Sequence, residues 1–119
     1  MIKINISQKL AQFKDHWNPR IIGELNQQHV KIAKIKGEFI WHKHDDEDEM
    51  FLVLKGTLKI EFRDRTETIQ ENEIIIVPKG VEHKPIADEE VSIMLFEPAT
   101  TINTGDLENE RTRKNLESI

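Results

Sequence analysis

The sequence predicts an all-β fold, a small barrel or sandwich formed by a single domain of 119 residues. Short runs of β-branched and aromatic residues follow one another from about residue 20 to residue 98. Turn-forming residues separate these runs at intervals of roughly eight to twelve residues, which is typical of antiparallel barrels and sandwiches. In Leu58–Phe62, apolar residues alternate with charged ones, as expected for a strand with one buried face.

A short helix is expected before the barrel, over residues 7–17, with Ser7 as its N-cap. Apolar residues recur there at helical spacing: Leu10, Phe13 and Trp17. The helix should end at Asn18-Pro19, because the residue before a proline disfavours the helical conformation.

Eight or nine short strands should then form the core barrel over residues 20–98. Their expected ranges are 21–25, 30–35, 39–44, 50–54, 58–62, 66–70, 74–77, 83–86 and 91–96. The turns carry characteristic residues, such as Lys55-Gly56, Pro78-Lys79-Gly80 and the polar Asp88-Glu89-Glu90. The polar tail of residues 99–119 is expected either to wrap over the barrel or to be loosely ordered.

Some of these strands are apolar on both faces, notably 50–54, 74–77 and 93–96. An antiparallel strand with one solvated face would alternate, so the outer face of these strands needs a cover. The cover could be the amino-terminal helix, the tail or a second copy of the chain. We expect a homodimer, because obligate interfaces resemble a protein core cut in half.

The composition excludes several classes of function. A net charge of −5 argues against nucleic-acid binding, which needs a basic surface. No apolar run approaches the ~20 residues of a membrane span, and the first nine residues lack the apolar segment of a signal peptide. The absence of cysteine excludes disulfides and thiolate chemistry. We therefore expect a cytoplasmic protein that contacts neither nucleic acid nor membrane.

A group of histidines and acids suggests a metal site. His42 and His44 lie two residues apart, and in a strand such residues point to the same face. Glu49 and His83 complete a set of three imidazoles and one carboxylate, although Glu47 and Asp48 are local rivals of Glu49. Such ligands suit one divalent ion of Fe, Mn, Ni, Cu or Zn. The alternative is that His42 and His44 are a pair of surface histidines that bind no metal.

Two motifs that contain these residues resemble the paired signatures of the cupin superfamily. The first is Gly37-x4-His42-x-His44-x4-Glu49-x6-Gly56, and the second is Asn72-x5-Pro78-x-Gly80-x2-His83. The resemblance implies a double-stranded β-helix, or jelly-roll barrel, with His42, His44, Glu49 and His83 as metal ligands. The chain departs from the pattern in three places. The gap after Gly37 is one residue shorter, Asn72 replaces a glycine, and Ala87 replaces an asparagine.

The resemblance leaves the reaction open, since this fold serves isomerases, dioxygenases and lyases. We expect a metal-dependent enzyme acting on a small polar metabolite; the alternative is a non-catalytic protein that binds a metal and a small ligand. Most strand lysines and arginines fall on the outward phase, and no acid or base is evident beyond the ligands. The pocket is expected to include Phe51 and Val53, on the face of Glu49, together with Met94 and Phe96. Trp41 alternates with His42 and should point away from the metal.

Overall fold

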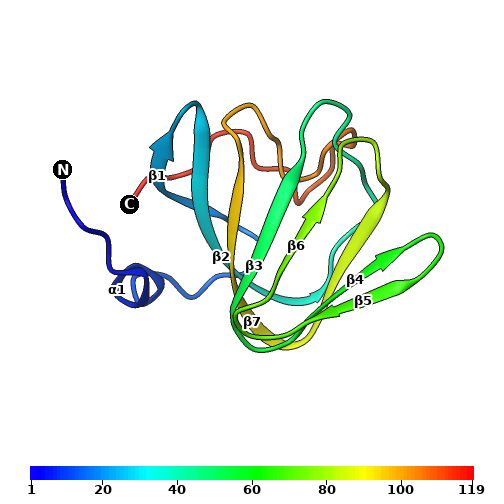
Figure 1. Ribbon diagram of the computed structural model, residues 1–119, viewed down its shortest axis with the longest axis horizontal. Coiled ribbons are helices and arrows are strands. Elements are labelled where there is room, and N and C mark those ends of the chain that lie inside the picture. The colour runs from blue at the N-terminus through cyan, green and yellow to red at the C-terminus, as the bar shows by residue number, and fades with distance from the viewer.

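The computed structural model describes residues 1–119 and confirms the all-β jelly-roll fold with one short helix. The elements are α1 (Ile6–Leu10), β1 (Arg20–Leu25), β2 (Gln28–Glu38), β3 (Glu49–Lys55), β4 (Leu58–Phe62), β5 (Thr66–Ile69), β6 (Ile74–Val77) and β7 (His83–Pro98). In Figure 1 the strands curve around a common interior, and α1 lies to one side next to the amino terminus.

Strand β7 organises the sheet. The main path of hydrogen-bonded strands is β1-β2-β7-β3-β6, and β4 pairs with both β5 and β7. The carboxyl-terminal half of β7 lies between β2 and β3, whereas its first residues pair with β4 (Figure 1). One strand therefore connects the two halves of the barrel.

The core is the set of side chains that point into the barrel from these strands. Period-two alternation places every second residue inside, as in β3, where Glu49, Phe51 and Val53 are buried and their neighbours are only half-buried. Twelve buried apolar residues form the core: Ala33, Ile35, Phe51, Val53, Leu58, Ile60, Ile69, Val77, Ala87, Val91, Ile93 and Leu95.

The amino-terminal helix is shorter than the sequence predicts. It spans Ile6–Leu10, and Asn5 rather than Ser7 is its N-cap, accepting a hydrogen bond from the backbone of Gln8 at 2.9 Å. It cannot extend to residue 17, because Trp17 adopts a left-handed φ of 58°. Phe13 lies beyond the helix and packs with Ile22 and Ile32 in a small second core outside the barrel.

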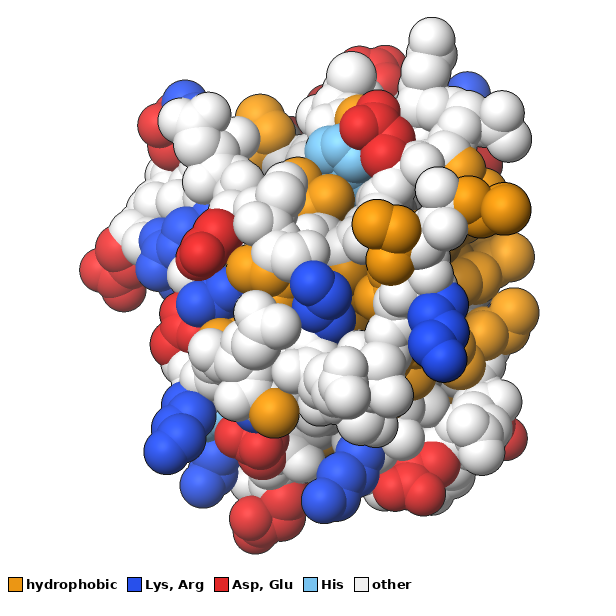
Figure 2. Space-filling model, turned by 90° about the vertical axis from the view of Figure 1, so that its left-hand side faces the viewer, with side chains coloured by type: hydrophobic (Ala, Val, Ile, Leu, Met, Phe, Trp, Pro, Cys, Tyr) orange, Lys and Arg blue, Asp and Glu red, His pale blue; other side chains and the backbone are white.

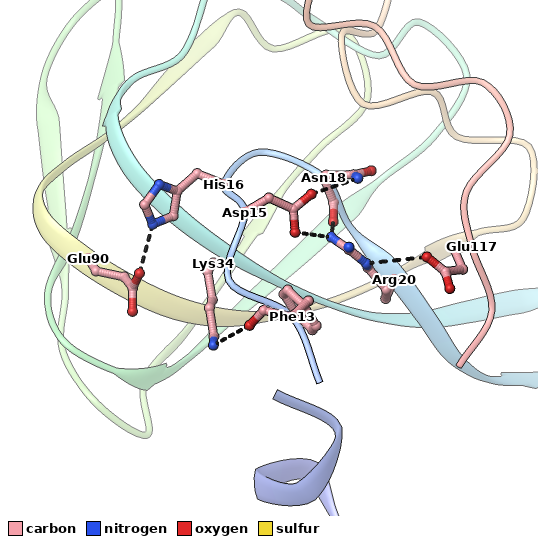
Figure 3. Close-up of polar contacts among 8 residues, drawn as sticks. All are labelled: Phe13, Asp15, His16, Asn18, Arg20, Lys34, Glu90 and Glu117. Carbon is pink, nitrogen blue, oxygen red and sulfur yellow. Dashed lines mark hydrogen bonds and ion pairs between the residues drawn. The ribbon is translucent and has the colours of Figure 1, made fainter. Parts of the chain in front are cut away.

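Polar contacts hold the segment after α1 against the barrel (Figure 3). Lys34 of β2 donates a hydrogen bond to the carbonyl oxygen of Phe13 at 2.7 Å. The Arg20 guanidinium donates to Asp15 at 2.7 Å and lies 3.9 Å from Glu117, near the carboxyl terminus. Both ends of the chain are thereby fastened to the same side of the sheet.

The structure differs from the predicted strands in two places. The ranges 83–86 and 91–96 are one continuous strand, because β2 pairs with both parts of it and passes the expected polar turn with a bulge between Ile35 and Gly37. The range 39–44 contains only an isolated bridge at His42, so it runs along the barrel without joining the sheet.

The tail of residues 99–119 wraps over the barrel, one of the two expected arrangements. Within the tail, the backbone N–H of Asp106 donates a hydrogen bond to the carbonyl oxygen of Lys43 at 2.9 Å, and Thr104 is fully buried. Ser118 forms a parallel bridge with Ile21 of β1. No helix in the structure has the length and apolar character needed to cross a membrane.

Candidate metal centre

The structure brings His42, His44, Glu49 and His83 together inside the barrel. The first two come from the segment before β3, Glu49 is the first residue of β3, and His83 is the first residue of β7. All four are at least 96% buried. Their ligand atoms lie within 4.8 Å of one another, so the cluster could hold one metal ion.

Backbone pairing explains why the two histidines furthest apart in sequence become neighbours. His42 and His83 form an isolated antiparallel bridge, with reciprocal N–H···O=C bonds of 3.1 and 2.9 Å. Their ring centroids consequently lie 4.3 Å apart. The loop before His83 is held in turn by Gly80, whose N–H donates to the carbonyl oxygen of His44 at 2.7 Å.

Contacts with backbone carbonyl oxygens orient two of the imidazoles. The Nδ1 atom of His42 lies 2.9 Å from the carbonyl oxygen of Ile40, and the Nδ1 atom of His83 lies 2.9 Å from that of Val81. A carbonyl oxygen can only accept, so Nδ1 must carry the proton in both rings. The Nε2 atoms are therefore the unprotonated nitrogens, which is the tautomer that binds a metal.

Several buried polar atoms in the cluster have no hydrogen-bond partner, which is unusual in a folded protein. They are Nδ1 and Nε2 of His44, Oε1 of Glu49 and Nε2 of His83. Glu49 Oε1 lies 3.5 Å from His44 Nε2 and 3.4 Å from His83 Nε2. Ligands ~2.0–2.2 Å from a shared ion are separated by roughly these distances. The donor set and its spacing fit a divalent transition metal.

The electrostatics of the site favour a neutral His42. Burial, with a smaller contribution from the adjacent His83, lowers the pKa of His42 to about 4. For His44, burial acts to lower the pKa, but the adjacent Glu49 carboxylate outweighs it and the pKa is raised. Burial would raise the pKa of Glu49, yet contacts with Glu97 and the histidines hold it well below its usual range.

The rival acids lie elsewhere. Glu47 is at the surface, where it accepts a hydrogen bond from Thr100 at 2.9 Å, and Asp48 accepts one from the backbone of Lys79 at 2.9 Å. Neither belongs to the cluster. His16 pairs with Glu90 on the outside of the barrel at 2.7 Å, as Figure 3 shows, so it too is remote from the site.

A cavity of about 50 Å³ opens beside His42 and Glu49. Phe51 lines this cavity, as expected, whereas Val53 lies deeper in the barrel core. The expectation that Met94 and Phe96 line the pocket is wrong. Their neighbours Ile93 and Leu95 point inward, so strand alternation places Met94 and Phe96 on the outer face.

Trp41 is half-buried outside the cluster, and the Arg63 guanidinium stacks 3.8 Å from the centroid of its ring. Its side chain is absent from the cavity wall. This agrees with its expected orientation away from the histidines.

Sequence reasoning missed a buried ion pair next to the cluster. Lys31 and Glu97 are each 2% exposed, and Lys31 Nζ donates to Glu97 Oε1 at 2.8 Å. Glu97 also lines the cavity. Lys31 alternates with inward Ala33 and Glu97 with inward Leu95, so strand phase places both residues inside once the inner face is known.

Glu97 has an unusual environment for a carboxyl group. Burial and the neighbouring Glu49 carboxylate raise the pKa of Glu97 well above its usual range, and Lys31 offsets only part of this rise. Its second oxygen, Oε2, is buried without a hydrogen-bond partner.

A jelly-roll barrel with three histidines and one glutamate converging inside it defines a cupin. The cupin-domain family matches residues 28–97, so the chain belongs to this family. The resemblance carried by the two motifs is thereby confirmed.

The chain is similar to two solved structures over most of its length. A cupin-2 domain protein from Shewanella frigidimarina is 52% identical, with a TM-score of 0.79 over 80% of this chain and 93% of that one. A Neisseria meningitidis protein is 33% identical, with a TM-score of 0.76 over 82% of this chain and 99% of that one.

Among curated proteins, the chain is 42% identical over 64 residues to the uncharacterized protein YdbB of Bacillus subtilis. The match covers 53% of this chain and 57% of that relative.

Proposed function

We propose that the protein binds one divalent transition metal through His42, His44, Glu49 and His83 and acts on a small polar metabolite. The observation that carries the proposal is the convergence of four buried ligand atoms, of which Glu49 Oε1 and His83 Nε2 have no other partner. Leaving such atoms unpaired in the interior costs about 1–3 kcal/mol each, and a bound cation would satisfy them.

The arrangement supports an enzyme of isomerase, dioxygenase or lyase type more than a purely structural metal site. Four protein ligands leave one position free on a five-coordinate ion and two on a six-coordinate ion, whereas structural sites are normally closed. When bound, the ion would supply Lewis-acid polarisation of a substrate oxygen. The chain's own contribution is a small cavity of about 50 Å³, with Phe39 and Phe51 in its wall and two of the ligands, His42 and Glu49, at its side.

Metal analysis of purified variants tests the ligand assignment. The wild-type protein, expressed in supplemented medium, should carry about one equivalent of a divalent transition metal. His83→Ala and Glu49→Gln should each lower the affinity at least ~10-fold, because ligands and their partners each contribute that much or more. Glu47→Gln is the matched control and should keep full occupancy, since Glu47 bonds Thr100 at the surface.

Wild-type protein without metal, or a Glu47→Gln variant as depleted as Glu49→Gln, would refute the assignment. Metal-loaded protein that stays silent in O2-consumption and aldose–ketose screens would favour the non-catalytic binding role.

We also propose that the protein is a homodimer formed through the outer face of β3, β6 and β7. The strand register aligns apolar residues there in two rows, Ile76–Met50–Phe96 and Ile74–Leu52. Ile74 and Ile76 are 56% and 58% exposed. Figure 2 shows hydrophobic side chains gathered along one edge of the molecule, in contrast to the mixed charges elsewhere on that view.

The two other segments that could cover this face, the amino-terminal segment and the tail, pack elsewhere on the barrel. The small core of Phe13, Ile22 and Ile32 takes up Met94 and Leu54, with Ile119 of the tail beside them. It does not reach β6, which is the edge of the sheet path. A self-complementary apolar surface is what a symmetric dimer requires, so a second copy of the chain is the occupant we propose.

A further inference from the structure

We infer that Glu97, held by Lys31, is a ligand-binding residue of the cavity, and that the site takes small α-hydroxy carboxylates. This inference rests on the proposed metal centre and narrows its ligand class. It begins from the position of Glu97, which lines the cavity together with His42 and Glu49.

The ion pair has a geometry that leaves one oxygen of Glu97 without a donor. Lys31 Nζ donates to Oε1 of Glu97 at 2.8 Å, whereas Oε2 is buried beside Glu49 and accepts no hydrogen bond from the protein. The pairing of β2 with β7 sets this geometry. Lys31 is opposite Leu95 and His29 is opposite Glu97, so the lysine and the glutamate are diagonal neighbours on the inner face.

Stability alone does not explain the buried ion pair of Lys31 and Glu97. Burying two charges costs several kcal/mol per ion, and well-packed apolar residues in their place are often as stable or more so. Two such residues would also leave no unpartnered oxygen next to Glu49. A role in ligand binding explains both the charges and the free oxygen.

The size and charge of the site indicate the ligand. One water needs ~10–15 Å³ of cavity volume, so a cavity of about 50 Å³ holds a molecule of only a few non-hydrogen atoms. With a divalent ion, Glu49, Glu97 and Lys31 together, the site keeps a net positive charge, which suits a monoanion. Its carboxylate would face the metal position, and a neighbouring hydroxyl would reach Glu97.

A hydroxyl group matches Glu97 Oε2 because it both donates and accepts hydrogen bonds. It therefore pairs with a carboxyl group in either protonation state. Apolar side chains of Phe39, Phe51 and Ile93 line the same cavity and lower the local polarity, which strengthens the contribution of this contact to selectivity.

Glycolate and acetate test the inference, because they differ by one hydroxyl group. Binding of each to zinc-loaded protein is measured by NMR titration, with the metal content of every sample determined in parallel. Wild-type protein should bind glycolate at least ~10-fold more tightly than acetate, as expected when a buried hydrogen bond is lost and its partner stays unpaired. Glu97→Ala should remove this preference and keep the metal.

Glu97→Ala leaves Lys31 buried without a partner, which destabilises the fold, so the double variant Lys31→Met/Glu97→Leu is measured as well. It removes both charges and should fold, bind zinc and treat the two anions alike. Glu47→Ala, outside the cavity, is the matched control and should keep the wild-type preference.

Zinc-loaded wild-type protein without a preference for glycolate, or a folded double variant that retains it, would overturn the inference and leave the metal centre standing. Wild-type protein that binds no metal would instead refute the metal centre, and the inference with it.

Discussion

The burial of His42 changes the response of the protein to acid. In the unfolded chain its imidazole should titrate near pH 6.5, whereas burial and His83 lower the pKa in the folded, metal-free protein to about 4. Between these pH values the unfolded chain binds more protons than the folded one. The contribution of His42 therefore reduces the free energy of unfolding as the pH falls from about 6.5 to about 4.

Replacing His42 by asparagine should remove this contribution. The free energy of unfolding of His42→Asn, relative to wild type, should rise by about 3 kcal/mol between pH 7 and pH 4, since one pKa unit corresponds to ~1.4 kcal/mol. Urea unfolding of both proteins after metal removal provides the measurement. Comparing two proteins matters, because the raised pKa of His44 acts in the opposite direction. Parallel pH curves would contradict the prediction.

At the same scale, the sequence predicts that the three histidines and Glu49 cluster, but it predicts the residues that line the cavity poorly. The spacing of His42 and His44 is independent of tertiary structure, and the two motifs place Glu49 and His83 in register with them. Glu97 follows a four-residue apolar run, in which strand phase is hard to assign without knowing which face is inside. The same ambiguity put Met94 and Phe96 in the pocket instead of Ile93 and Leu95.

At the scale of elements, the tail loop depends on one glycine that touches the ligand segment. Gly105 has a φ of 60°, and a Cβ atom there would lie 2.1 Å from the carbonyl oxygen of Lys43 and 3.2 Å from the His42 ring. A larger residue would have to push the loop away from the segment that carries His42. The hydrogen bond from Asp106 to Lys43 would be lost with it.

Gly105→Ala should therefore destabilise the protein by roughly 2–4 kcal/mol, adding backbone strain to a steric overlap. It should also expose the tail to trypsin at Arg111 and Arg113. Gly37→Ala is the matched control. Gly37 also has a positive φ, of 87°, but open space at its Cβ position, so only the strain of roughly 1–2 kcal/mol applies. Urea unfolding measures both, and equal costs would contradict a close contact at Gly105.

Elements with local signals were predictable, and those set by distant pairing were not. β4 and β6 begin and end where the sequence indicates, because alternation and turn residues mark their ends. β7 runs through Asp88-Glu89-Glu90 despite their polarity, since the long strand β2 lies alongside. α1 stops early for a comparable reason, as Phe13 and Trp17 are used in packing against the barrel.

At the scale of the whole molecule, the proposed dimer gives a direct prediction. Sedimentation equilibrium at micromolar concentration should yield twice the 14.0 kDa mass of one chain. The double variant Ile74→Lys/Ile76→Lys should be monomeric, because it places two charges on the apolar face of β6. Leu107→Lys alters an exposed apolar residue of the tail and should remain dimeric. A monomeric wild type, or a dimeric lysine variant, would exclude this interface.

The central position of β7 also determines when the barrel can form during synthesis. Gln28 pairs with Pro98, and β3 pairs with the same strand from its other side, so neither strand has its main partner until β7 has left the ribosome. At a synthesis rate of ~5–20 residues per second, the edges of β2 and β3 that pair with β7 stay unpaired for several seconds. Such long-range pairing makes folding slow, on the order of milliseconds to seconds once the chain is complete. The nascent chain thus exposes unpaired strand edges until its last strand emerges.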